Sequence, residues 1–325
     1  MAAPRRSPRI LVMHEVAPYP HVLYPLREAG EVVVEPPDQR RLAANLGQYD
    51  AYVASLAVRV NDEALGNAGR LRVIATSSTG TDHIEMDRCR QIGIEVISLK
   101  DDIEFLRGIT CTAELAFGLL LAVARNLPWA FDAAKQGFWG RDAFRGHQIS
   151  GKTLGVLGVG RLGTMMARYG LAFRMRVLGC DVRKIEEPGV EQVDMETLLR
   201  ESDYLSVHVH LDDSTRGMLG KREFAAMKDG AVLVNTSRGA VLDEDALLNA
   251  LVSGKLGGAG CDVICGEWDA NLSDHPLVRY ARTHQNLIIV PHIGGVTFES
   301  QEAAMSRTCA KLAAWLAAHS PSSAP

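Results

Sequence analysis

Three side chains that carry or exchange charge each follow a short apolar run in the second half of the chain: Arg238, Glu267 and His292. Ligands of open α/β sheets bind beyond the carboxyl ends of the strands, so all three are expected at the binding edge. An arginine there can hold a carboxylate through two parallel hydrogen bonds. A histidine can exchange a proton near neutral pH, and a carboxylate bonded to its other nitrogen favours the charged ring.

Each of these residues also has an ordinary structural interpretation. A loop arginine commonly faces solvent, and an isolated glutamate can be any exposed acid. A histidine after a strand is more often a hydrogen-bonded structural residue than a catalyst. Taken together, the three residues favour a catalytic role over a structural one, because arginine, glutamate and histidine beside a nicotinamide ring suit hydride transfer to a 2-keto acid. The hypothesis therefore requires a dinucleotide site in the same chain.

A glycine-rich turn at residues 158–163 (GVGRLG) follows a candidate strand and precedes a candidate helix. Gly158 permits the tight turn, Gly160 lets the backbone approach a pyrophosphate, and Gly163 lets the helix pack on the strand. Free N–H groups and the dipole at the helix start favour an anion. Asp181 ends the next candidate strand, where a carboxylate can bind the adenosine ribose. This pattern predicts a dinucleotide site; the alternatives are a structural turn or an S-adenosylmethionine site.

Asp181 also bears on the choice between the two nicotinamide cofactors. Its negative charge would repel the 2′-phosphate of NADP, which favours NAD. Arg183 and Lys184 follow closely and weaken that preference, because a nearby cation can accept the 2′-phosphate. We therefore expect NAD, with NADP the less favoured cofactor.

Short β-branched runs alternate with amphipathic stretches such as residues 82–91, a pattern typical of parallel sheets built from right-handed crossovers. A long helical stretch, 112–136 with Pro128 inside it, separates two such series. The candidate strands of the two series are residues 10–13, 32–35, 51–54, 72–76 and 95–98, and then 153–157, 176–180, 204–209, 231–235, 259–263 and 287–290.

Helix signals support the second series. Asp194 and Asp243 precede helical patterns as N-caps, and Gly254 ends the second of these patterns. One more helix is predicted at residues 300–318, followed by a Pro/Ser tail at 319–325 that is expected to be disordered.

The two series, with a last helix that returns to the first, predict an α/β protein of two doubly wound parallel-sheet domains. We expect a Rossmann NAD-binding domain at residues 111–292. It would be inserted into a flavodoxin-like substrate-binding domain made of residues 1–110, with 293–325 returning to it. The 325 residues suit two domains of ordinary size.

Composition excludes several classes of protein. Apolar residues at 47% and charged residues at 23% are typical of a soluble globular protein, so a disordered or fibrous chain is excluded. A net charge of −4 argues against nucleic acid as a partner. No apolar run reaches the roughly 18 residues of a membrane helix, and no signal-peptide core follows the basic N-terminus. The six cysteines lie mostly in apolar segments, which indicates reduced thiols and a cytoplasmic protein.

Taken together, the motifs resemble those of the D-isomer-specific 2-hydroxyacid dehydrogenase family, which contains D-3-phosphoglycerate, hydroxypyruvate and D-lactate dehydrogenases. The resemblance covers roughly residues 10–318, and the order and spacing of its motifs match the family pattern. These motifs are TAELAFGLLLAVARNL at 112–127, GKTLGVLGVGRLG at 151–163, MKDGAVLVNTSRGAVLDEDALLNAL at 227–251, GAGCDV at 258–263 and NLIIVPHIGG at 286–295.

The resemblance implies a role for each charged residue. Arg238 occupies the position of the family's substrate-anchoring arginine, His292 that of its acid/base histidine, and Glu267 that of the acid that pairs with the histidine. Asp262 matches the residue that faces the nicotinamide carboxamide. The other positions implied to bind the cofactor, besides the glycines and Asp181, are Thr112, Arg161, Leu162, His210, Thr236, Ser237 and Gly294.

A turn in the first domain is implied to bind substrate. Ser78, Thr79 and Gly80 resemble the family's G-x-G-x-D turn, in which the N–H groups of Thr79 and Gly80 would receive the substrate carboxylate. The family layout also implies an active-site cleft between the domains that closes on the substrate, and a homodimer built around the nucleotide domains.

Three departures from the family pattern are expected to reshape specificity without removing a catalytic group. Cys265, Gly266 and Trp268 stand in what is usually an acidic, proline-rich stretch around the glutamate. His210 stands where the family often has proline. Ser78 replaces the first glycine of the carboxylate-binding turn.

The expected reaction is hydride transfer between NAD(H) and a D-2-hydroxy acid/2-keto acid pair, with protonated His292 donating to the carbonyl oxygen. The alternative is a non-catalytic NAD(H) sensor or corepressor-like scaffold on the same fold; the presence of arginine, glutamate and histidine favours the enzyme. A metal enzyme would have to use the pairs His208/His210 and Cys261/Cys265, but no third ligand follows at zinc spacing, so no metal is expected.

Overall fold

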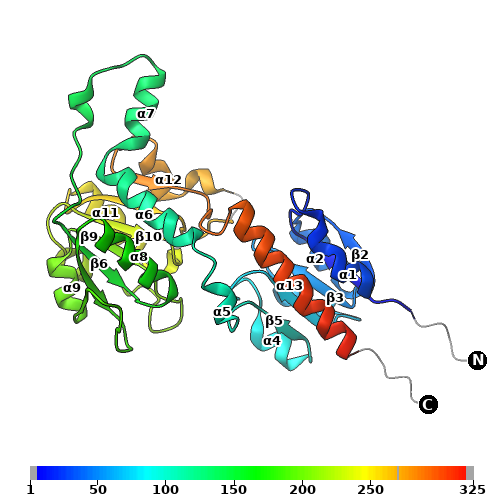
Figure 1. The fold of residues 1–325 in the computed structure, drawn as a ribbon. Coiled ribbons are helices and arrows are strands. Elements are labelled where there is room, and N and C mark those ends of the chain that lie inside the picture. Colours follow the sequence, from blue (N-terminus) through cyan, green and yellow to red (C-terminus); the bar gives the residue numbers. More distant parts are fainter. Residues whose placement is uncertain (1–5, 269–270, 320–325) are drawn as a thin grey trace, which may run out of the picture. The chain divides into compact units, whose positions relative to one another are not determined.

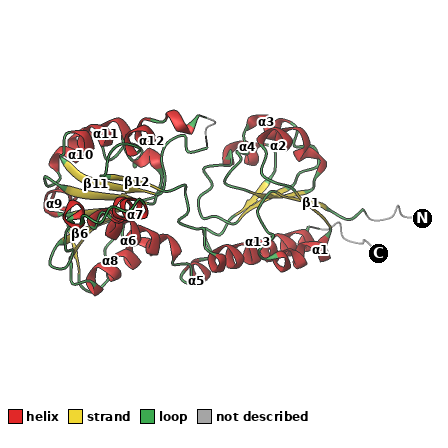
Figure 2. Ribbon diagram, turned by 90° about the horizontal axis from the view of Figure 1, so that it is seen from above, coloured by secondary structure: helices red, strands yellow, loops and turns green. Residues whose placement is uncertain are grey.

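The computed structural model describes residues 6–268 and 271–319, and the chain divides into two compact units. Unit 1 comprises Met1–Gly108 and Thr297–Pro325, and unit 2 comprises Ile109–Val296. Each unit is built on one parallel sheet with helices packed against it (Figures 1 and 2). Most of the tail predicted to be disordered lies outside the described residues.

The sheet of unit 1 has the strand order β2-β1-β3-β4-β5, and every pairing in it is parallel. This is the flavodoxin-like order, in which the chain reverses direction across the sheet between β1 and β3. Of the three inner strands, β3 and β4 are buried along their whole length because helices cover both faces. The strands are β1 (Arg9–Val12), β2 (Glu31–Val34), β3 (Ala51–Ala54), β4 (Val73–Thr76) and β5 (Glu95–Ile97).

Two apolar layers sandwich this sheet. One joins the sheet to α2, α3 and α4, and the other joins it to α1 and α13. The last helix therefore completes a core that the first residues begin, because Met305, Cys309, Leu312 and Leu316 pack with Ile10 and its neighbours. The helices of unit 1 are α1 (Tyr24–Ala29), α2 (Gln39–Asn45), α3 (Asp62–Gly66), α4 (Met86–Gln91), α5 (Ile103–Leu106) and α13 (Phe298–Ala318).

The sheet of unit 2 has the order β12-β11-β10-β9-β6-β7-β8, again with parallel pairings. The chain builds one side of the sheet from β6 and then crosses to the other side at β9, which is the Rossmann arrangement. A ligand crevice forms at such a switch point, outside the carboxyl ends of the strands. The strands are β6 (Thr153–Leu157), β7 (Arg176–Cys180), β8 (Val190–Gln192), β9 (Tyr204–Val207), β10 (Ala231–Asn235), β11 (Leu256–Cys261) and β12 (Leu287–Ile289).

Helices cover both faces of this sheet. Among the described residues, the segment Ile103–Ala124 is apolar and long enough to be considered as a membrane span. Within it, α6 packs on β10 and β11 and buries Leu119 and Leu120, so it serves as a core helix. The helices of unit 2 are α6 (Cys111–Ala124), α7 (Leu127–Lys135), α8 (Arg161–Ala172), α9 (Met195–Glu201), α10 (Lys221–Ala226), α11 (Glu244–Val252) and α12 (Pro276–Ala281).

The predicted fold class, two doubly wound parallel-sheet domains, is confirmed, and so are the caps of α9 and α11. Asp194 and Asp243 each accept a hydrogen bond from the third residue of the following turn, Thr197 and Ala246.

Three local predictions were wrong. The helix predicted over 112–136 is two helices, because Asn126 has a left-handed φ of 53° and α7 begins anew at Leu127, with Pro128 in its first turn. The short edge strand β8 was missed. The stretch 82–91 is helical only from Met86, because Ile84 pairs in a β-bridge with Val60.

Candidate active site

The turn after β10 presents Arg238. Asn235 ends the strand fully buried, and its side chain organises the turn: Oδ1 accepts from the Ser237 N–H (3.0 Å) and hydroxyl (2.7 Å), and Nδ2 donates to the Arg238 carbonyl (3.0 Å). Arg238 is half-buried, and its Nη1 donates to the Ser237 carbonyl at 2.7 Å. Asn235 was not among the predicted site residues; its signal in the sequence is an amide at the end of an otherwise apolar strand.

Glu267 and His292 form a direct pair. Oε1 of Glu267 lies 2.7 Å from Nδ1 of His292, and the two side chains are 19% and 17% exposed. The remaining oxygen, Oε2, accepts from the Ile264 N–H at 3.4 Å. Because Nδ1 is engaged, Nε2 is the ring nitrogen left to meet a substrate. The Trp268 ring lies beside the imidazole, with centroids 6.1 Å apart.

Asp262 fixes the turn that carries His292. Its carboxylate oxygens accept from the N–H groups of Ile293 (2.7 Å) and Gly294 (2.9 Å), and its carbonyl accepts from His292 N–H (2.9 Å). Burial raises the pKa of Asp262, while the two N–H donors oppose that shift. His292 has a φ of 53°, a left-handed conformation that this bonding maintains. A Cβ on Gly294 would lie 2.7 Å from Asp262 Oδ2 and 3.1 Å from Thr112 Cγ2, so these three residues meet at one place.

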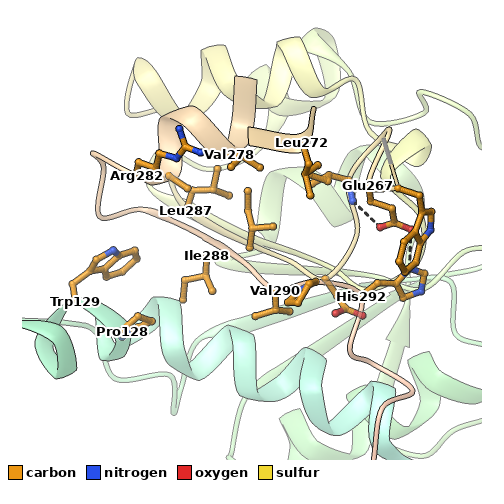
Figure 3. A pocket seen from close by; sticks show the side chains of 16 residues that line it. Pro128, Trp129, Glu267, Leu272, Val278, Arg282, Leu287, Ile288, Val290 and His292 are labelled. Atoms are coloured by element: carbon orange, nitrogen blue, oxygen red, sulfur yellow. Dashed lines mark hydrogen bonds and ion pairs between the residues drawn. The ribbon is translucent and has the colours of Figure 1, made fainter. Parts of the chain in front are cut away.

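A cavity of about 440 Å³ adjoins the pair. Glu267 and His292 lie together at one end of it in Figure 3, and Trp129 and Arg282 mark the other end. Between them the edge strand β12 contributes apolar side chains, including Leu287 and Ile288, and Val290 follows directly after the strand.

The glycine-rich turn has the shape that its sequence predicts. Gly158 has a φ of 84°, and a Cβ there would lie 2.9 Å from the His208 backbone. A Cβ on Gly163 would lie 2.0 Å from the Gly158 carbonyl oxygen, so α8 packs directly on the turn. Gly160 caps α8 and is open, since its nearest neighbour would be Arg183 Nη2 at 3.6 Å.

Asp181 closes the far side of this turn. Its two oxygens accept from the N–H groups of Val159 (2.8 Å) and Arg183 (2.9 Å), and Arg183 Nε lies 3.5 Å away. Arg161 begins α8 beside Leu162, and its guanidinium donates to the Ile109 carbonyl. Burial lowers the pKa of Arg161.

These features fit a dinucleotide. Thr236 Oγ1 is buried and has no hydrogen-bond partner among the described residues, which suits a cofactor contact. The open Gly160 leaves room for a pyrophosphate at the start of α8. His210 is exposed at the same edge, and its carbonyl accepts from Thr215 Oγ1 at 2.6 Å. Nearby, His208 Nε2 lies 2.7 Å from Ser206 Oγ, and burial lowers the pKa of His208 to about 4.

The turn Ser78–Gly80 belongs to unit 1, where it follows β4. Ser78 Oγ donates to the Gly80 carbonyl (2.5 Å) and lies 3.0 Å from Thr76 Oγ1. Thr76 in turn lies 3.3 Å from Nε2 of the buried His83. Thr76 and His83 were not among the predicted site residues, and they support this turn through the contacts of Thr76 Oγ1.

The histidine and cysteine pairs considered for a metal do not gather into a cluster. Within residues 6–268 and 271–319, no three His, Cys, Asp or Glu side chains converge as metal ligands. Burial raises the pKa of the Cys261 thiol to about 12. Cys265 is exposed as a residue, but partial desolvation of its thiol and the nearby Glu244 raise its pKa to about 11.

A dinucleotide turn at the switch point of a Rossmann sheet, with an imidazole–carboxylate pair elsewhere in the same unit, defines the chain as an oxidoreductase of the nicotinamide-dependent class. The family model of the D-isomer specific 2-hydroxyacid dehydrogenase, NAD binding domain, matches residues 117–294. The chain belongs to the D-isomer specific 2-hydroxyacid dehydrogenase family, which confirms the resemblance found in the sequence.

Known relatives of the chain include enzymes of this family. It is 35% identical to a hydroxypyruvate reductase of Thermotoga maritima, covering 85% of this chain and 87% of the relative. It is 38% identical to a glyoxylate reductase of Thermococcus litoralis, covering 82% and 80%. A D-lactate dehydrogenase of Aquifex aeolicus, solved with NAD and lactic acid, superposes with a TM-score of 0.83 at 29% identity, covering 95% and 96%.

Proposed function

We propose that this oxidoreductase interconverts a small 2-keto acid and its D-2-hydroxy acid, with His292 as acid/base, Glu267 as its partner and Arg238 as the carboxylate anchor. The observation that carries this proposal is the 2.7 Å contact between Nδ1 of His292 and Glu267, which directs Nε2 toward a substrate. The named relatives are enzymes, which favours this function over a non-catalytic sensor.

When bound, the nicotinamide cofactor supplies a hydride for the carbonyl carbon. Nε2 of His292 donates a proton to the carbonyl oxygen in reduction and accepts one in the reverse direction. Glu267 accepts from Nδ1 and favours the charged ring, because a carboxylate stabilises an adjacent cation. Arg238 binds the substrate carboxylate and fixes the carbonyl in line with the proton donor. Asp262 keeps His292 in place through the N–H groups of the next two residues.

The residues of the cofactor crevice favour NAD over NADP. The Asp181 carboxylate lies where an adenosine ribose is bound in this fold, and its charge opposes a 2′-phosphate. Arg183 is 74% exposed and is the group that would lessen this preference. We expect kcat/KM to be higher with NADH than with NADPH. Asp181→Ser should lower the ratio of the NADH value to the NADPH value. Equal use of the two cofactors by the unaltered enzyme would contradict this preference.

Small 2-keto acids are the proposed substrates because the relatives are named for hydroxypyruvate and glyoxylate and the Aquifex structure contains lactic acid. We also propose that the N–H groups of Thr79 and Gly80 bind the substrate carboxylate. NADH oxidation should be measured against glyoxylate, hydroxypyruvate, phosphohydroxypyruvate, pyruvate and bulkier keto acids. Nucleotide binding without NADH consumption on any of them would favour the sensor instead.

The proton-transfer role is tested with His292→Ala. General acid catalysis contributes about 10²–10⁴-fold, so we expect a loss of that order in kcat. His284→Gln is the control, since His284 is exposed and its contacts are local: its ring stacks on Tyr280, and Nδ1 lies 3.0 Å from the Tyr280 carbonyl and from Thr283 Oγ1. Arg238→Ala should raise KM and lower kcat together. Near-full turnover by His292→Ala would exclude the proposed acid/base.

We further propose a homodimer formed through the segment 127–147, which projects from the sheet of unit 2 (Figure 1). This segment exposes large apolar side chains, and Trp139 is 87% exposed. Phe131→Glu should shift the protein from dimer to monomer in analytical ultracentrifugation. A monomeric unaltered protein would contradict the proposal.

A cytoplasmic location is proposed because the cysteines are free thiols, as in a reducing compartment. Cell fractionation tests this location.

A further inference from the structure

A second carboxylate–imidazole pair, Glu244 with His275, lies near the first in unit 2. Nε2 of His275 is 3.2 Å from Oε2 of Glu244, and each side chain is only 15% exposed. Nδ1 of His275 accepts from the Leu277 N–H at 3.3 Å, at the start of α12. Because Nδ1 acts as an acceptor, the proton of the neutral ring is on Nε2, and it is donated to Glu244. The pair therefore links the start of α11 to the start of α12.

The other oxygen of Glu244 holds the loop that carries the catalytic glutamate. This loop, residues 262–268, is called the Glu267 loop below. Oε1 of Glu244 accepts from the Cys265 N–H at 2.8 Å, two residues before Glu267. Glu267 itself is tied to the loop through Ile264 N–H and then bonds His292. Glu244 is thus linked to the imidazole through three residues of backbone and one carboxylate.

The same stretch of the loop is pressed against the turn that presents Arg238. A Cβ on Gly239 would lie 2.3 Å from the Ile264 carbonyl carbon and 2.4 Å from the Cys265 nitrogen. Only a glycine allows this approach of two backbones. A shift of the loop is therefore transmitted both to Glu267 and to the neighbour of Arg238.

The groups around Glu244 hold its carboxylate in one position. The groups that face it are His275 from α12 and Cys265 from the Glu267 loop, and the Cys265 thiol also lies in the fields of Arg216 and Glu267. Burial raises the pKa of Glu244, while the Cys265 N–H and His275 oppose the rise. Two donors aimed at a largely buried carboxylate fix it in one geometry.

We infer that Glu244 is a positioning residue, which with His275 fixes the Glu267 loop so that Glu267 meets Nδ1 of His292. This inference rests on the proposed function of His292, and it adds a buried support that acts without touching substrate. Removing Glu244 leaves the Cys265 N–H unpaired and removes the bond that holds the loop in place. A misplacement of about 1 Å can cost about 100-fold in rate.

The first test is kinetic and uses Glu244→Ala with Asp245→Asn as control. Asp245 is exposed in the same turn of α11, so its variant removes one negative charge without touching the loop. For Glu244→Ala we expect kcat of keto-acid reduction to fall about 10- to 100-fold. The high-pH limb of its pH profile should also move down by about one unit, because a poorly placed carboxylate favours the charged ring less. An unchanged profile, or the same shift in Asp245→Asn, overturns the inference.

A second variant distinguishes loss of the positioning role from a folding defect in Glu244→Ala. His275→Asn keeps an N-cap acceptor for Leu277 but is too short to reach Glu244. We expect the same direction of change with a smaller size, because the Cys265 bond remains. Wild-type kinetics in His275→Asn together with an unfolded Glu244→Ala would show a merely structural contact and would overturn the inference.

The third readout does not depend on activity. In protein labelled with ¹⁵N-histidine, the His292 Nδ1 proton bonded to Glu267 should give a resonance that His292→Asn removes. That resonance should weaken or shift in Glu244→Ala and persist in Asp245→Asn. If it is unchanged in Glu244→Ala, the positioning role is refuted even when His292 is the acid/base. If His292→Ala keeps full turnover, the proposed function fails. The His292 Nδ1 proton resonance of the unaltered protein and of Glu244→Ala still tests the positioning role in that case.

Discussion

Replacing Gly239 by alanine probes how tightly the Arg238 turn and the Glu267 loop are joined. The new Cβ would lie 2.3 Å from the Ile264 carbonyl carbon and 2.4 Å from the Cys265 nitrogen, both of them backbone atoms. Carbon atoms pack at about 3.5–4 Å, so the two segments must separate by about 1 Å. Overpacking of this kind costs about 1–3 kcal/mol of stability. A displacement of about 1 Å between reacting groups costs about 100-fold in rate.

We therefore expect Gly239→Ala to lower kcat/KM for keto-acid reduction about 100-fold while most of the protein stays folded. Steady-state NADH oxidation and thermal unfolding measure the two effects separately. Gly118→Ala is the control: Gly118 is exposed on α6 with open space around it, so alanine there should stabilise the helix by about 0.5–1 kcal/mol and leave activity unchanged. Wild-type kcat/KM in Gly239→Ala would refute the reasoning that these two segments position the chemistry together.

Three further predictions concern burial, the cofactor turn and an exposed thiol. The pKa of His208 falls from 6.5 in the unfolded chain to about 4 when folded, so its contribution to stability is complete above pH 6.5 and is lost as the pH falls toward 4. Urea unfolding should show that between pH 7 and pH 4 the wild type loses about 3 kcal/mol more than His208→Gln; equal losses would contradict this. Gly163→Ala places a Cβ 2.0 Å from the Gly158 carbonyl oxygen, so the affinity for NADH should fall at least about tenfold in a fluorescence titration. An unchanged Kd would argue against NADH binding at the glycine-rich turn. Cys265 is exposed, yet its thiol pKa is raised to about 11, so iodoacetamide should modify it about 100-fold more slowly at pH 8 than a thiol of ordinary pKa. Glu244→Ala should speed this reaction, because it removes a negative charge beside the thiol. An ordinary rate in the unaltered protein would be evidence against the raised pKa.

Most of the strands followed from local signals in the sequence. The runs 153–157, 176–180 and 231–235 are strands with the predicted bounds, because both faces of such strands are buried and apolar residues therefore run without interruption. The pair of Glu267 and His292 was expected from residue types at strand ends and from the family pattern, and the structure brings the two side chains into contact.

Other features depend on contacts that no local pattern encodes. The break at Asn126 replaces one long helix by two because a single residue adopts a left-handed conformation, which the surrounding helical pattern conceals. None of the three residues of edge strand β8 is buried, so the strand lacks an apolar signature. Glu244 acts through hydrogen bonds to distant segments, the Cys265 N–H and the His275 ring, and sequence spacing does not report such bonds. The bonds of Asn235 are local to its own turn, but a single amide at a strand end does not reveal them.

The return of α13 to unit 1 has a consequence for biosynthesis. Residues 9–97 provide the strands of that sheet early, but the face that packs on Met305, Leu312 and Leu316 is covered only by the short α1 region until α13 leaves the ribosome. Unit 2 is complete in sequence before then and can fold first. Nascent chains should therefore expose an apolar sheet face for most of translation, and this face is the natural place for a chaperone to bind.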